Sequence, residues 1–210
     1  MSELNFTHSN GNKVKLTTPD TLAANRTFKL PGADGTAGQV LMTDGNGNLS
    51  FVDPPYSVYD KWVGASTTTG RQNPYTNWVR HSYTGVHIAT GMSHSSGIFT
   101  FPKTGLYKVT LDLAMLTSGA SQDNYANVRI ELSTNSGGAF TTLKEVITGG
   151  IQNLASGHSG HVFINVTDAS TFRVRFQTAS LGSGSTVRGN AANSMAYTTV
   201  SFERLTDAQS

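Results

Sequence analysis

The sequence predicts an all-β fold, and three observations carry this prediction. The chain is rich in Thr, Val, Tyr and Phe, which favour strands, and in Gly, Asn and Ser, which favour turns. No segment keeps a 3.6-residue apolar period, and residues 21–25, TLAAN, would form one helical turn at most. Several segments instead alternate apolar and polar residues, as half-buried antiparallel strands do. Many such strands at short spacing indicate a sandwich or a barrel.

Composition limits the classes of function. Only 13% of the 210 residues are charged and the net charge is +2, with Lys and Arg scattered rather than gathered into a basic patch, so we expect no nucleic-acid partner. There is no cysteine, which excludes disulfides and thiolate sites. No apolar run approaches 18 residues and no hydrophobic signal segment follows Met1, so we expect synthesis in a cytoplasm and no membrane insertion.

Residues 1–55 are predicted to form a short β segment that is not stable alone. The stretch TDGNGNLSF, residues 43–51, predicts a hairpin turn. Each expected strand holds few apolar residues, so the segment needs a partner, either a neighbouring domain or copies of itself. The expected strands lie near residues 14–16, 27–30, 40–43 and 49–52.

A domain boundary is predicted at VDPPYS, residues 52–57. The Pro-Pro pair removes two backbone donors and stiffens the chain, and aromatic residues become frequent after it. We therefore expect a second domain over residues 56–210, with longer strands. These strands are expected at residues 78–83, 86–89, 98–101, 105–116, 126–133, 140–146, 160–166, 171–178 and 197–205.

The clearest alternation lies in YKVTLDLAM, residues 107–115, where every second residue from Tyr107 to Met115 is apolar. The segment TFRVRFQT, residues 171–178, alternates in the same way and places Arg173 and Arg175 on its polar face. Two interpretations of these arginines are open, a solvated outer face and ion pairing between subunits.

The stretch GIFTFPKTGLYKVTLDL, residues 97–113, resembles the signature strand pair of C1q-like domains. The family pattern Gly-x-Phe-x-x-Pro-x-x-Gly-x-Tyr is matched by Gly97, Phe99, Pro102, Gly105 and Tyr107. Two later blocks are similar to the closing strands of the family, GHVFINVTDASTFRVRFQ at residues 160–177 and AYTTVSFERL at residues 196–205, the latter with the buried Phe202. The usual Gly-Asp turn is replaced by TDAS in the first of these blocks.

This resemblance covers roughly residues 78–205. It implies a jelly-roll sandwich of the C1q/TNF type, assembly into a compact homotrimer, and binding rather than catalysis. Pro102 fixes φ and Gly105 permits an unusual φ, so the break between them is expected to aim the strand at residues 105–116 into the core. In the resembled family this strand also lies close to the threefold interface.

The first domain carries a second resemblance. Its stretch LPGADGTAGQVLMTDGNGNLSF, residues 30–51, is similar to a block of the type LPxADGTxGQVLxTDGxGxLSF in tail-fibre and other virion proteins of marine bacteriophages. In those proteins the block precedes a terminal head domain. The resemblance implies a virion protein whose first 55 residues form a stem or contact the particle; the alternative is a generic hairpin linker.

Recognition residues are predicted from the expected topology. If both termini of the jelly roll lie at one end, as in the resembled family, the loops near residues 117–125, 148–159 and 179–196 lie at the other. Exposed loops on a rigid scaffold are where recognition concentrates. The side chains there best able to contribute contact energy are Tyr125, His158 and Arg188. The alternative is that these loops are only polar connections.

Metal and catalytic sites are not indicated. His158 and His161 are three residues apart, so on a strand they point to opposite faces, although a threefold axis could gather one His from each subunit. DGNGNL, from Asp44, begins like a calcium loop but lacks the Gly and Glu that such a loop requires, which favours a hairpin turn. Serine motifs are incomplete and acids are dispersed, so we expect no enzyme, metal or cofactor.

The sequence thus predicts a bacteriophage virion structural protein, a homotrimeric short fibre or knob displayed on the particle that adheres to a host-surface glycan or protein. Its N-terminal segment would contact other virion proteins. The alternative is a capsid decoration or head-fibre protein that stabilises or displays. A surface-glycan hydrolase is a distant alternative, disfavoured because no acid pair is visible.

Overall fold

The structure, a computed structural model, describes residues 3–17, 21, 23–80, 87–117, 125–149, 155–182, 184–190 and 196–209. The chain divides into two compact units, Met1–Val52 and Asp53–Ser210. The predicted boundary after residue 55 lies just beyond this division. Within the described ranges all regular structure is β, and no helix long and apolar enough to cross a membrane is found there.

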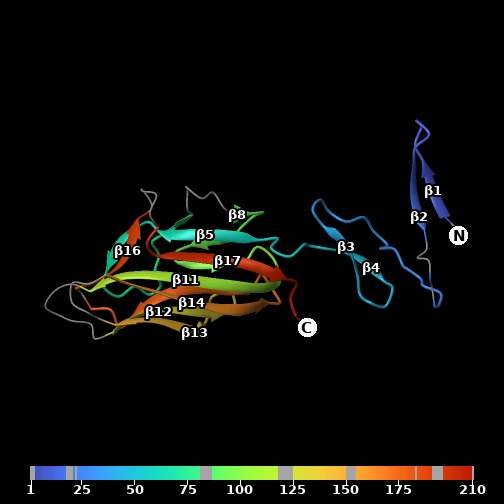
Figure 1. The fold of residues 1–210 in the computed structure, drawn as a ribbon. Helices are drawn as coiled ribbons and strands as arrows, with labels where there is room; N and C mark the ends of the chain where they lie inside the picture. Colours follow the sequence, from blue (N-terminus) through green and yellow to red (C-terminus); the bar gives the residue numbers. More distant parts are fainter. Residues whose placement is uncertain are drawn as a thin grey trace. The chain divides into compact units, whose positions relative to one another are not determined.

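The N-terminal unit consists of two separate antiparallel hairpins (Figure 1). The first joins β1 (Glu3–Thr7) to β2 (Lys13–Thr17), and the second joins β3 (Val40–Thr43) to β4 (Leu49–Val52). The predictions for β2, β3 and β4 are confirmed, whereas β1 was not expected. The strand predicted at residues 27–30 is wrong, because this stretch contributes only an isolated bridge between Lys29 and Asn48.

The turn from β3 to β4 is organised by Asp44. Its carboxylate accepts hydrogen bonds from the backbone N–H groups of Asn46 (2.8 Å) and Asn48 (3.1 Å) and from the Asn48 side-chain amide (2.6 Å). The pKa of Asp44 is lowered, first by the Asn48 side chain and then by the Asn46 N–H. DGNGNL therefore forms the predicted hairpin turn, and N–H groups of the turn itself donate hydrogen bonds to the Asp44 carboxylate.

The C-terminal unit is a sandwich of two antiparallel sheets (Figure 1). The larger sheet has the order β6-β16-β11-β17-β5-β7, with β14 paired to β11 and β8 paired to β5. Its strands are β5 (Tyr59–Gly64), β6 (Ser66–Thr69), β7 (Trp78–Arg80), β8 (His87–Ile88), β11 (Gly105–Thr117), β14 (Ala155–Val166), β16 (Ser185–Asn190) and β17 (Thr199–Thr206).

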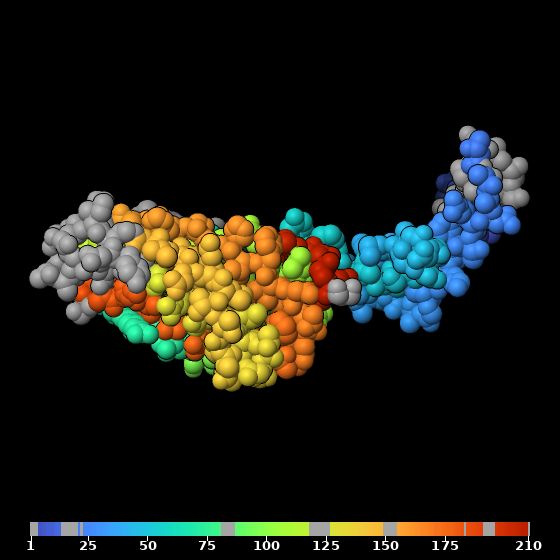
Figure 2. All heavy atoms as spheres, turned by 90° about the horizontal axis from the view of Figure 1, so that it is seen from below, coloured from blue at the N-terminus to red at the C-terminus, as the bar shows by residue number. Residues whose placement is uncertain are grey.

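The smaller sheet has the order β13-β12-β15-β10-β9. Its strands are β9 (Ser93–Ser95), β10 (Ile98–Thr100), β12 (Tyr125–Ser133), β13 (Thr141–Gly149) and β15 (Arg173–Ala179). The two sheets approach each other where β13, yellow in Figure 2, runs beside β14, orange. Gly160 permits this approach, because a Cβ there would lie 2.6 Å from Cγ2 of Val146 on β13.

The core fills the space between the sheets. The apolar face predicted for residues 107–115 is confirmed, since Tyr107, Val109, Leu111, Leu113 and Met115 are all buried. An aromatic cluster drawn from both sheets is centred on Phe99 of β10, whose ring centroid is 5.2 Å from that of Trp62, 5.8 Å from Phe176 and 5.0 Å from Phe202. Several of these contacts are edge-on, the arrangement that aromatic quadrupoles favour.

The motif glycine Gly97 closes the β9–β10 hairpin. Ser96 and Gly97 both have positive φ, +48° and +83°, as a two-residue hairpin turn of the primed type requires. A Cβ on Gly97 would lie 2.7 Å from Cγ of Pro74 and 2.8 Å from the Tyr75 carbonyl oxygen. His94 accepts a hydrogen bond from the Gly97 N–H through Nε2 (3.1 Å), and burial lowers the pKa of His94. Only glycine suits this position sterically.

Several boundaries differ from the predictions. β5, β6, β9 and β16 were not expected, and β14 begins at Ala155 rather than near residue 160. His158 therefore lies inside β14 and Arg188 inside β16, so their predicted placement in loops is wrong. Both strands are rich in Ser, Gly and Asn, residues that favour turns, and sheet pairing with β11 overrides that preference.

Candidate interaction surfaces

The C-terminal unit has two different ends. We call one end the base; there Gly105, which begins β11, pairs with Val166, which ends β14. At the distal end, Leu116 pairs with Ala155, and Tyr125 with Gly149. The strands that flank the predicted loops at residues 117–125 and 148–159 therefore end together, opposite the base. The connecting residues 118–124 and 150–154 lie outside the described residues.

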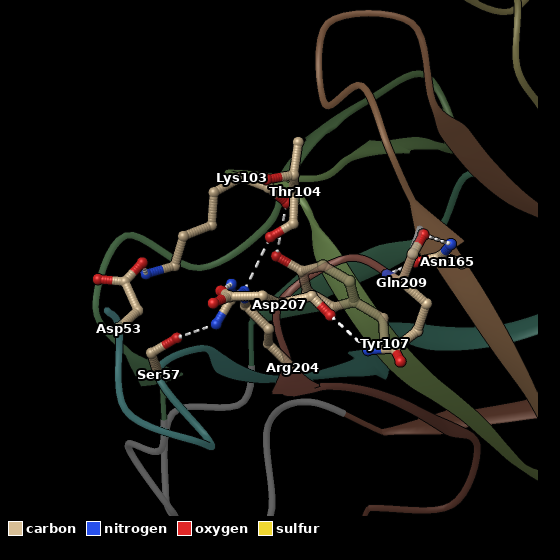
Figure 3. Close-up of polar contacts among 9 residues, drawn as sticks. All are labelled: Asp53, Ser57, Lys103, Thr104, Tyr107, Asn165, Arg204, Asp207 and Gln209. Atoms are coloured by element: carbon tan, nitrogen blue, oxygen red, sulfur yellow. Dashed lines mark hydrogen bonds and ion pairs between the residues drawn. The ribbon is translucent and has the colours of Figure 1, made fainter. Parts of the chain in front are cut away.

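The base is built around Arg204, which is only 2% exposed (Figure 3). Its guanidinium donates hydrogen bonds to the Thr104 carbonyl oxygen (2.8 Å) and to Ser57 Oγ (3.0 Å), and it pairs with Asp207. Three segments distant in sequence, around Ser57, Thr104 and Arg204, thus meet at one cation. The Asp207 carboxylate balances the charge of the guanidinium, and the two oxygens accept its N–H groups. Without such partners, burying the guanidinium would lower the stability of the fold by several kcal/mol.

The motif residues Pro102, Gly105 and Tyr107 belong to this base. Gly105 has φ +151°, and a Cβ there would lie 2.5 Å from Nε of Arg204, so the predicted need for glycine is confirmed. Tyr107 donates a hydrogen bond to the Lys103 carbonyl oxygen (2.9 Å), which fixes the turn that follows Pro102. Burial raises the pKa of Tyr107 to about 12.

Both ends of the unit's chain are tied to this base (Figure 3). Lys103 Nζ lies 2.8 Å from Oδ2 of Asp53, the first residue of the unit. The tail is held by Asn165, whose side chain donates to the Gln209 carbonyl oxygen and accepts from the Gln209 N–H, both at 2.8 Å. The entering and leaving segments therefore lie at the same end of the sandwich.

The outward face of the larger sheet, which we call the large-sheet face, mixes apolar and charged groups. Register aligns Ile88, Tyr59, Glu203, Lys108 and Phe163 across β8, β5, β17, β11 and β14. Phe163 is 58% exposed and Ile88 is 48% exposed. The next row places His161 beside Thr110, and the His161 ring lies 5.5 Å from the Phe163 ring.

Charged side chains of both signs also lie on the large-sheet face. Among the described residues, none forms an ion pair with Lys61, Lys108 or Glu203, although Lys108 and Glu203 are opposite each other in register. Burial and the nearby Glu203 raise the pKa of Tyr59. A surface with exposed aromatic and aliphatic groups and charges of both signs is suited to a protein partner.

The outward face of the smaller sheet, the small-sheet face, is different. Arg129 pairs with Glu145 at 2.7 Å, and Arg175 pairs with Glu131 at 2.7 Å. Arg173 donates to backbone carbonyl oxygens of the turn before it, including that of Ser170 at 2.8 Å. Arg173 and Arg175 therefore find acceptors within their own chain, which removes the reason for assigning them to ion pairs between subunits.

The three predicted recognition residues lie at different places. Tyr125 begins β12 at the distal end, and its side chain lies outside the described residues. His158 is exposed on β14 and pairs in register with Leu113. Arg188 lies on β16, where its guanidinium carbon is 4.1 Å from the ring centroid of Tyr197. His158 and Arg188 thus lie on different strands, and Tyr197 is a residue that the sequence did not indicate.

The histidine pair of β14 behaves as its spacing predicts. His161 belongs to the large-sheet face, whereas His158 is on the other side of the strand, because β14 runs along β11 without a bulge. Within the described ranges no group of three or more His, Cys, Asp or Glu side chains could hold a metal ion.

Comparison with known proteins rests on structure. No protein-family model matches the sequence, and no curated protein matches it. The Eiger TNF of S. frugiperda superposes with a TM-score of 0.57 at 12% identity, covering 75% of this chain and 97% of that chain. Murine APRIL gives 0.50 at 10% identity, covering 70% and 98%. The globular domain of zebrafish complement 1qA gives 0.48 at 13% identity, covering 73% and 99%.

At these identities the likeness concerns the fold alone. The superposition on two TNF-type structures establishes a jelly-roll sandwich of that type, so the predicted C1q/TNF-like, all-β fold is confirmed. Phe99, Tyr107 and Phe202, the aromatic residues of the predicted motif, all lie in its core.

Proposed function

We propose that the protein is a non-enzymatic structural component of a bacteriophage virion, in which a homotrimeric C-terminal knob is displayed on the particle and adheres to a host-surface glycan or protein. The single structural observation that supports display of the knob is the polarity of the C-terminal unit. Asp53 and Gln209 are both held at the base, whereas the distal strand ends lie opposite. A unit tethered at one end presents the other, where exposed loops suit recognition.

The large-sheet face supports the trimer. Its exposed Phe163 and Ile88 provide apolar area, and Lys61, Lys108 and Glu203, which form no ion pair among the described residues, provide charges of both signs that a second copy could complement. Three copies on one particle would also give avidity to weak contacts at the distal ends. The virion role rests on the resemblance of residues 30–51 to phage fibre segments.

A matched pair of substitutions tests which face assembles. Phe163→Asp places a charge on the large-sheet face, and we expect it to weaken trimer association by at least tenfold, because burying an unpaired carboxylate costs several kcal/mol. Ile147→Asp is the control, since Ile147 is 49% exposed on the small-sheet face. Sedimentation equilibrium measures both. Equal weakening by the two substitutions, or none by Phe163→Asp, would refute this assignment.

Electron microscopy of the parent particle, labelled with an antibody against residues 56–210, tests the virion role. Label at the tail or baseplate is the expected result for a host-adhesion fibre. Label distributed over the capsid would replace adhesion with the capsid-decoration alternative. Absence of label from every particle would contradict the virion role.

A further inference from the structure

The β3–β4 hairpin, which we call the ribbon, is apolar on both of its faces. Strand alternation places Val40 and Met42 on one face and Leu41 and Phe51 on the other. All four side chains are exposed, at 45%, 51%, 50% and 39% of their surface respectively. A two-stranded ribbon is marginally stable in water. On one face the Phe51 ring packs against the backbone of Gly35, where a Cβ would lie 2.6 Å from Cγ of Phe51, yet the apolar side chains of both faces keep exposed surface.

The ribbon also lacks charge. Neither VLMT nor LSFV contains an ionisable side chain. The whole N-terminal unit has a net charge of zero, because its four acidic residues equal its four basic residues. The acidic residues are Glu3, Asp20, Asp34 and Asp44, and the basic residues are Lys13, Lys15, Arg26 and Lys29. Association of identical copies therefore meets no net electrostatic repulsion.

The β1–β2 hairpin provides an internal contrast. Leu4 and Phe6 are exposed on one of its faces, while Glu3 and Asn5 alternate to the other, where Asn5 pairs in register with Lys15. A hairpin with one apolar face can be covered by one flat surface. The ribbon needs cover on two sides, which a single flat surface of another virion protein cannot provide.

We propose that the ribbons of three copies pack together around a threefold axis, each burying one face against each of its two neighbours. Such a heterologous contact closes into a ring when each copy is turned by a third of a full rotation from the next, as the threefold axis requires, and it then covers both faces of every ribbon. The inference rests on the proposed homotrimer. Trimeric C-terminal units would hold the attached ribbons at an effective concentration on the order of millimolar, which favours a contact too weak to form between free hairpins.

Disulfide trapping in the full-length chain tests this packing, because the protein has no cysteine of its own. The double variant Leu41→Cys/Met42→Cys places one thiol on each face. Adjacent Cα atoms lie about 3.8 Å apart, below the usual span of a disulfide, so bridging within a chain is disfavoured. Mild oxidation should link most of the protein into a covalent trimer on a non-reducing denaturing gel.

The matched control is Leu4→Cys/Asn5→Cys, which places adjacent thiols on the two faces of the β1–β2 hairpin. We expect it to yield little covalent trimer. Equal trapping in both variants would overturn the assignment to the ribbon, because proximity alone would then explain the links.

Sedimentation of the same samples separates the two proposals. A trimeric protein whose Leu41→Cys/Met42→Cys variant forms no covalent trimer would overturn the ribbon packing and leave the homotrimer standing. A monomeric protein would contradict the homotrimer and, with it, the ribbon packing.

Discussion

The two units of this chain differ in how far their apolar side chains are buried. In the C-terminal unit two sheets enclose Phe99, Phe176 and Phe202, which are 0% exposed. In the N-terminal unit Phe28, Phe51 and Met42 remain exposed, because isolated hairpins have no second layer. The buried core of the C-terminal unit can account for the stability of that unit. The N-terminal unit has the composition of a surface that other molecules cover.

The largest effect that would sharpen this contrast comes from a pair of phenylalanines. Phe99→Ala removes a ring that packs against those of Trp62, Trp78, Phe176 and Phe202. We expect this substitution to lower the free energy of unfolding of the C-terminal unit by about 3–5 kcal/mol. Phe28→Ala should change that quantity by less than about 0.5 kcal/mol, as exposed substitutions do. Denaturant titration followed by tryptophan fluorescence measures both. Similar losses would break the comparison.

A second contrast concerns charge inside and outside the sandwich. Asp60 is fully buried, its carboxylate pairing with Arg80 (3.0 Å) and accepting from the Met92 N–H (2.7 Å). Asp60→Ala should lower the free energy of unfolding by about 2–4 kcal/mol. This is somewhat less than the loss for a wholly buried ion pair, because Arg80 is partly exposed. Lys103→Ala breaks a half-exposed pair and should cost about 1 kcal/mol or less. Thermal unfolding should rank the two variants in this order; the reverse order would contradict it.

A third and smaller effect concerns alkaline pH. The pKa of Tyr107 is raised to about 12 by burial, whereas an exposed tyrosine in the unfolded chain ionises near 10. Between these values the unfolded state has lost a proton that the folded state keeps, so the free energy of unfolding falls as pH rises from about 10 to about 12. Tyr107→Phe removes this group and should flatten that part of the stability profile relative to the parent chain. An unchanged slope would show that Tyr107 does not contribute to it.

Sequence patterns predicted the strands in which apolar and polar residues alternate and the turns that carry typical turn residues. Alternation identified the buried face of β11, and turn residues located β3 and β4 to the residue. The same alternation places Arg204 in phase with Val200 and Phe202, so its burial could have been inferred. Its acceptors at Thr104 and Ser57 could not, because they come from distant segments.

The surfaces were harder to predict, because they depend on which strands become neighbours. The pair Arg175–Glu131 joins residues 44 positions apart, and the row from Ile88 to Phe163 crosses five strands. β16 was missed because its residues favour turns, and Arg188 was therefore assigned to a loop. Strand pairing, rather than local propensity, decides these positions.

Native mass spectrometry of the full-length protein at micromolar concentration measures whether identical copies complete the surfaces that a single chain leaves exposed. We expect a trimer, with a mass of three times 22.3 kDa. A stable monomer of 22.3 kDa, with both units folded, would contradict it.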